Sequence, residues 1–195
     1  QALFVKNRKI RSLKKSEEEG KFVQSNLVVA YQMQDFKKNE YDNVLAVFSE
    51  IFCGASLNSK LYQYLRNENS LCYRVQTIYQ KYDECLLISV GLDGKNKKLA
   101  VSLIQKAMKE MVKGKFCDEE LEMAKKQLQF AITMSLDNQS SITNNYVFHN
   151  LAGLPFLEER GKKIMEVTKQ DVMNLAKKMK HVLTYEMKEA THEGD

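Results

Sequence analysis

The chain has 195 residues, of which 44% are hydrophobic and 28% charged, and its formal net charge is +5. This composition is that of a globular domain, and it excludes disordered and collagen-like chains. No stretch approaches the roughly 20 consecutive apolar residues of a membrane helix, so no membrane span is expected. The lysines are scattered among acidic residues, and a solvated surface is therefore favoured over a nucleic-acid-binding face.

The first 23 residues are polar and highly charged. We predict that residues 1–23 form a charged arm or interdomain linker and that residues 24–195 form one domain. The chain does not begin with Met and shows no signal peptide, so we expect a fragment or a processed chain. The domain is predicted to open with a strand over residues 24–33, where apolar side chains alternate.

Apolar residues at helical spacing predict two helices over residues 40–52 and 57–68, the first capped by Asn39. Two strands, 71–79 and 84–92, are separated by a short turn and are expected to form an antiparallel hairpin. Further helices are predicted over residues 97–113, 118–136, 140–151, 158–164 and 168–179, with caps at Asp118 and Thr168 and a final strand over 182–188. This order predicts a two-layer α+β domain, a mainly antiparallel sheet backed by helices.

The cysteines and histidines lack the spacing of metal or redox sites. Cys53, Cys72, Cys85 and Cys117 include no C-x-x-C pair, which is typical of reduced structural cysteines and predicts a cytoplasmic protein. None of the three histidines has a second histidine four or five residues away, so H-E-x-x-H and H-x-x-E-H are both absent. Because a catalytic zinc needs about three protein ligands, we predict no metal in this chain. The motifs of a hydrolase serine and of a phosphate-binding loop are also incomplete, so we predict no catalytic residue in this chain.

Arg66 and Tyr73 are the candidate binding residues. Arg66 is predicted at the end of a helix and Tyr73 at the start of the next strand, so a short loop brings a guanidinium and a phenol to one edge of the domain. Such a pair suits the binding of peptide carbonyls or of a developing oxyanion. The alternative is structural: Arg66 caps the helix C-terminus and Tyr73 packs in the sheet.

The segment around these two residues resembles the second domain of the pitrilysin/insulinase family of zinc peptidases, which includes the mitochondrial processing peptidases. The similar motifs are Ser59-Lys-Leu-Tyr62, Leu65-Arg-Asn-Glu68 and Ser70-Leu-Cys-Tyr-Arg-Val75, followed by Phe116-Cys-Asp-Glu-Glu-Leu121, Leu151-Ala-Gly-Leu-Pro155 and Val167-Thr-Lys-Gln-Asp171. The resemblance covers roughly residues 24–188. Three positions depart from the family pattern: Cys53 and Ser70 stand where Gly is usual, and Cys72 stands where Ala is usual.

The resemblance implies the fold and the role of the chain. The family consists of repeated α+β domains of the LuxS and mitochondrial processing peptidase type that face each other across a chamber. The first domain carries H-x-x-E-H and zinc, and the second supplies an Arg and a Tyr that hold the substrate. By resemblance those roles fall on Arg66 and Tyr73. The chain is then a substrate-binding C-terminal domain, inactive alone, and zinc lies in an N-terminal domain or a partner subunit.

The resemblance also leaves a second reading open. Some bacterial members occur as pairs in which one partner lacks H-x-x-E-H, and the details of residues 59–62 and 70–73 are similar to that partner. The chain would then belong to a pseudo-peptidase or scaffold subunit that pairs with a catalytic, zinc-binding homologue. A peptide is the expected ligand in both cases.

Overall fold

The computed structural model describes residue 10 and residues 12–20, 25–33, 42–54, 56, 58–80, 84–153 and 155–189. The described strands form a five-stranded sheet with the order β1-β5-β2-β4-β3. The strands are β1 (Lys14–Gly20), β2 (Ser25–Met33), β3 (Cys72–Gln80), β4 (Cys85–Leu92) and β5 (Met179–Glu189). Three of the neighbouring pairs are antiparallel, and only β1 and β5 are parallel. The predicted α+β class, mainly antiparallel, is confirmed.

The helices follow the predicted apolar periodicity. The α-helices are α1 (Asp42–Cys53), α2 (Lys60–Tyr62), α3 (Lys97–Val112), α4 (Asp118–Leu136), α5 (Gln139–Ala152), α6 (Leu157–Glu166) and α7 (Lys169–Lys177); η1 (Gln63–Asn67) is a π-helix and η2 (Gly94–Asn96) a 3₁₀ turn. None of the described helices is both long and apolar enough to cross a membrane.

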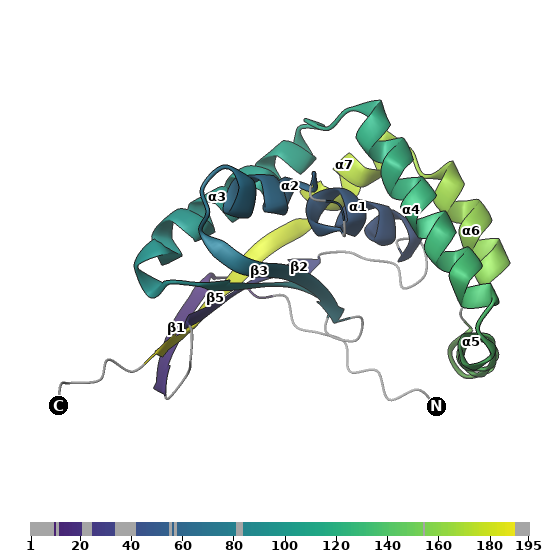
Figure 1. The fold of residues 1–195 in the computed structure, drawn as a ribbon, viewed down its shortest axis with the longest axis horizontal. Coiled ribbons are helices and arrows are strands. Elements are labelled where there is room, and N and C mark those ends of the chain that lie inside the picture. Colours follow the sequence, from purple (N-terminus) through teal and green to yellow (C-terminus); the bar gives the residue numbers. More distant parts are fainter. Residues whose placement is uncertain are drawn as a thin grey trace.

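The core lies between the sheet and the helices. Helices α1, α2, α3 and α7 lie over one face of the sheet in Figure 1, while α4 and α6 run side by side away from it. Leu27 and Val29 of β2 are fully buried, as are Ile88 and Val90 of β4. Alternate residues of these strands therefore face the helices, as the period of a half-covered sheet requires.

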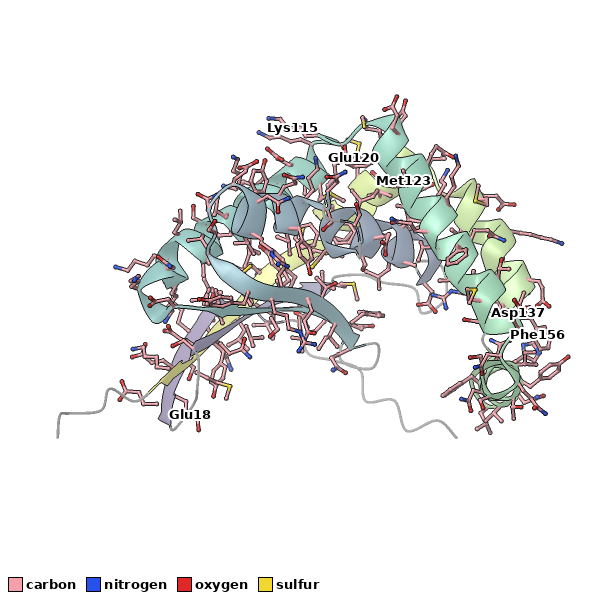
Figure 2. The ribbon with its side chains drawn as sticks, in the orientation of Figure 1. Glu18, Lys115, Glu120, Met123, Asp137 and Phe156 are labelled. Atoms are coloured by element: carbon pink, nitrogen blue, oxygen red, sulfur yellow. The ribbon has the colours of Figure 1, made fainter. Side chains whose placement is uncertain are left out.

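Helix α5 lies at the far end of the α4–α6 pair. Figure 2 shows Asp137, just past the end of α4, and Phe156 close to α5, whereas Glu120 and Met123 lie near the start of α4. The Phe156 ring stacks on His149 of α5, with 3.8 Å between ring centroids. No described residue of α5 is buried, so this helix is held mainly by contacts with Phe156 and the end of α4.

Strand β1 corrects the extent of the predicted arm. Residues 1–23 were expected to precede the folded domain, yet Lys14–Gly20 pair with Leu183–Glu189 as an edge strand. Glu17 of β1 also forms ion pairs with Lys188, at 2.9 Å, and with Lys97 of α3, at 3.6 Å. The remaining arm residues 1–9, 11 and 21–23 lie outside the described residues, as does residue 24.

One of the predicted helix caps is confirmed, and another is shifted by one residue. The Thr168 hydroxyl accepts from the backbone of Asp171, whose carboxylate accepts in turn from the Thr168 N–H at 2.9 Å, which confirms the predicted capping box. The cap of α4 is Cys117 rather than Asp118, because Glu120 reaches back to the Cys117 N–H at 2.7 Å. The predicted cap Asn39 lies outside the described residues.

Candidate functional site

Arg66 lies on a helical segment with unusual backbone geometry. Where the sequence predicted one regular helix, α2 passes into the π-helix η1, in which the Glu68 N–H donates to the carbonyl of Gln63, five residues earlier, at 2.9 Å. Leu61 and Leu65 are fully buried and anchor this segment to the core. Arg66, the next residue, is exposed. π-helical turns are rare in proteins, and those that occur often lie at functional sites.

A tight turn connects η1 directly to β3. The Ser70 N–H donates to the Arg66 carbonyl at 3.0 Å, and the Leu71 N–H donates to the Leu65 carbonyl at 2.7 Å. Ser70 has a φ of +50°, in the left-handed region. Glycine occupies that region without strain, which gives a physical reason for the glycine expected at this position from the family pattern.

Tyr73 projects from the start of β3, an edge strand. Cys72 pairs with Leu92 and Arg74 pairs with Gly91, so Tyr73 is an extra residue in the ladder. Its side chain is 80% exposed. Bulges of this kind re-aim a side chain and recur next to active sites. The backbone therefore turns the phenol of Tyr73 out of the sheet.

The charge of Arg66 lies near the first residue of β3. Burial raises the pKa of the Cys72 thiol, and the positive charge of Arg66 partly opposes that shift. The guanidinium carbon lies 5.9 Å from the centre of the Tyr62 ring, one helical turn earlier. Arg66 and Tyr73 thus flank the same turn, and both present polar groups to solvent.

The structural alternative for these two residues is not supported. Tyr73 does not pack in the sheet, since most of its surface is exposed. Among the described residues, none accepts a hydrogen bond from the Arg66 guanidinium or pairs with the Tyr73 hydroxyl. A cation and an O–H donor are therefore available at this edge. Together they are suited to a carbonyl or carboxylate ligand.

Tyr64 connects η1 to α3, and this contact was not predicted from the sequence. Its hydroxyl donates to Glu110 of α3 at 2.7 Å, and Lys106 lies 4.3 Å from its ring centre. Burial and the Glu110 carboxylate raise the pKa of Tyr64 to about 12, so it stays a neutral donor. The sequence indicated only that Tyr64 belongs to the apolar side of its helix, because one helix does not reveal which partner lies opposite.

The histidines do not form a zinc site in the described part of the chain. Both ring nitrogens of His181 are engaged: Nδ1 with Gln105 at 3.1 Å, and Nε2 with the Leu183 carbonyl and the Thr184 hydroxyl. His149 stacks on Phe156, and His192 lies outside the described residues. Within those described ranges, no group of three or more His, Cys, Asp or Glu side chains is arranged to hold a metal. Zinc thus has no site among them, and no chemistry of a bound metal is assigned to them.

Three similar proteins of bacterial origin, two of them with solved structures, are compared with this chain. The curated relative "Probable inactive metalloprotease YmfF" of Bacillus subtilis (strain 168) is 25% identical over 163 residues, which cover 82% of this chain and 36% of that protein. A conserved protein from Enterococcus faecalis V583 has a solved structure with a TM-score of 0.89 and 25% identity, and the match covers all of this chain and 46% of the other. A peptidase M16 inactive domain from Pseudomonas fluorescens gives a TM-score of 0.79 at 16% identity, covering 98% of this chain and 47% of that one.

The chain spans less than half the length of each of these relatives. The family model described as "Peptidase M16 inactive domain" matches residues 5–128, nearly two thirds of the chain. The matched range includes η1, the turn and β3, and hence both Arg66 and Tyr73. The chain therefore belongs to the family of inactive domains of the M16 peptidases.

Proposed function

We propose that this chain is the substrate-binding C-terminal domain of a zinc-dependent metallopeptidase. It holds the backbone of a peptide at the edge formed by Arg66 and Tyr73, and it contributes no metal ligand and no catalytic residue of its own. The observation that carries the proposal is the exposure of both side chains on either side of one tight turn, with Tyr73 turned outward by a bulge.

The chemistry of the two side chains defines what they bind. The guanidinium of Arg66 donates several hydrogen bonds in a fixed plane and keeps its charge at every physiological pH. The Tyr73 hydroxyl donates one further hydrogen bond. Two such donors match consecutive carbonyls of an extended peptide or one carbonyl that gains negative charge during hydrolysis. Zinc and the attacking water belong, in this proposal, to an N-terminal domain or to a zinc-binding homologous subunit.

A second function is favoured by the name of the curated relative. YmfF is described as an inactive metalloprotease, and it matches 82% of this chain. In this alternative the whole protein is a pseudo-peptidase that pairs with a catalytic homologue, and the edge at Arg66 and Tyr73 shapes the binding chamber. The sequence upstream of the domain separates the two proposals, because only the first requires H-x-x-E-H there.

A titration of the chain with a fluorescein-labelled casein peptide tests the proposed role. Arg66→Gln removes a charged donor and should weaken binding about 10-fold or more, and Tyr73→Phe should weaken it about 3-fold. Arg74→Gln is the matched control, because it removes the same charge from a neighbouring residue whose side chain donates to Gln76 at 2.6 Å. Equal affinities for all four proteins would refute the assignment, as would equal losses in Arg66→Gln and Arg74→Gln.

The cellular location proposed for the domain is the cytoplasm. None of the cysteines Cys53, Cys72, Cys85 and Cys117, all of which the structure describes, forms a disulfide, which suits a reducing compartment. Burial raises the pKa of Cys53 to about 12, so this thiol stays protonated and unreactive at neutral pH.

A further inference from the structure

A cavity lies at the opposite end of β3 from Tyr73. It is a partly open pocket with a volume of about 340 Å³, lined by the first turns of α1, by Tyr79 near the end of β3, by Asn145 of α5 and by Arg160 of α6. Most of its lining is apolar, including Leu45, Ala46 and Pro155. Tyr79 follows Tyr73 by six residues, which separates the two sites by roughly 20 Å of extended strand.

Two buried polar atoms on the cavity wall have no hydrogen-bond partner. They are the side-chain oxygen Oδ1 of Asn43 and the Nε nitrogen of Arg160. Among the described residues, none forms an ion pair or a hydrogen bond with the Arg160 guanidinium. Buried polar atoms in native proteins are nearly always paired, so an orphan donor and an orphan acceptor on one cavity wall call for a ligand.

The wall specifies the chemistry of that ligand. A guanidinium is the preferred partner of a carboxylate, which it binds through two parallel hydrogen bonds. The Asn43 oxygen accepts, so it needs an N–H from the ligand. The apolar wall takes a short hydrocarbon group. Asp42 also lines the cavity, and its negative charge disfavours a dianion such as phosphate more strongly than a singly charged carboxylate.

We propose that this cavity binds a carboxylate attached to a short apolar group with an adjacent amide, as found in the carboxyl-terminal residue of a peptide. Arg160 binds the carboxylate, Asn43 accepts the amide N–H of the terminal residue, and Leu45, Ala46 and Tyr79 enclose its side chain. The residues of this site are different from Arg66 and Tyr73. A failure of this proposal would therefore leave the proposed function untouched, and a failure of the proposed function would leave this site untouched.

Titration of the ¹⁵N-labelled chain with N-acetyl-alanyl-leucine, followed by two-dimensional NMR, tests the proposal. The resonance of the Arg160 Nε–H and those of the first turn of α1 should shift together. The carboxamide of the same dipeptide should bind at least 10-fold more weakly, because it lacks the negative charge. The chain variant Arg160→Gln should lose at least 10-fold in affinity for the acid, whereas Arg74→Gln should bind it as the unaltered chain does.

The remaining outcomes each count against the site. Equal affinity for the acid and the carboxamide would show that Arg160 does not bind the carboxylate. Shifts confined to other parts of the chain, or no saturable shift, would overturn the cavity as a binding site. Equally tight binding of 4-methylpentanoate, which has the carboxylate and the apolar group but no amide, would overturn the assignment to a peptide. The NMR spectrum of Arg160→Gln also reports directly whether that variant is folded.

Discussion

Single residues at the turn between η1 and β3 determine how the candidate site is presented. Ser70 adopts a φ of +50°, a conformation that costs an L-residue with a side chain roughly 1–2 kcal/mol. The turn nevertheless forms, because Leu65 and Leu71 on either side are buried and joined by a backbone hydrogen bond. Packing of the neighbours thus maintains a strained residue close to Arg66 and Tyr73.

Replacing Ser70 by glycine should relieve that strain. We expect Ser70→Gly to raise the free energy of unfolding by about 1 kcal/mol, since glycine adopts a positive φ without steric cost but loses more freedom on folding. Ser70→Ala retains the strain and serves as the control. Urea denaturation measures both. A Ser70→Gly variant no more stable than Ser70→Ala would show that the turn is not strained at this residue.

The identity of the candidate site residues could be predicted from the sequence, but their exposure could not. The spacing of Arg66 and Tyr73 indicated a shared loop, and the resemblance to the peptidase family indicated that both bind substrate. The bulge that exposes Tyr73 depends on the pairing of β3 with β4, which lies in the tertiary structure. Asn43 and Arg160 were not predicted, because they are 117 positions apart and neither belongs to a recognisable motif.

At the scale of elements, β1 shows how charge holds a strand that has little apolar surface. Six of its seven residues are exposed, and its sequence is Lys-Lys-Ser-Glu-Glu-Glu-Gly. It pairs with β5 along its length, and Glu17 connects it to Lys188 and to Lys97. The same contacts hold the pKa of Glu17 below its usual value, with Lys188 the largest cause.

Reversing the charge of Glu17 should loosen β1 without unfolding the domain. In Glu17→Lys the two ion pairs become repulsive contacts, so the backbone amides of β1 should exchange with solvent faster, while those of β2 keep their protection. Glu19→Lys is the matched control, because it introduces the same charge change in the same strand. Hydrogen exchange measured by mass spectrometry resolves the strands. Identical exchange of β1 in the two variants would mean that Glu17 has no special part in its docking.

The other elements were largely predictable because their apolar side chains recur at the regular spacing of a helix or a strand. Helices α3 and α4 show a clear apolar stripe, and β3 and β4 are joined by a short connection that favours a hairpin. Strand β1 lacks any apolar alternation, and its partner β5 lies more than 160 residues away, so no local pattern indicates it. The π-helical turn of η1 was also missed, because the apolar spacing of this segment is that of a regular helix.

At the scale of the whole molecule, the chain is one domain of a kind that occurs within longer proteins. It covers 46% and 47% of the two solved chains that it resembles, and it belongs to the inactive domains of the M16 peptidases. The described residues include no metal cluster, while one edge presents an exposed guanidinium and an exposed phenol. We therefore propose that this domain binds a peptide and that the catalytic chemistry is supplied from outside it.

Photo-crosslinking tests that claim most directly. A casein peptide carrying a benzophenone group is irradiated in the presence of the chain, and the modified residues are identified by mass spectrometry. We predict that the label concentrates on η1, the turn and the first residues of β3, and that it decreases there in the double variant Arg66→Gln, Tyr73→Phe while circular dichroism stays unchanged. Label distributed over other surfaces, or equal labelling of this edge in the double variant, would contradict the account.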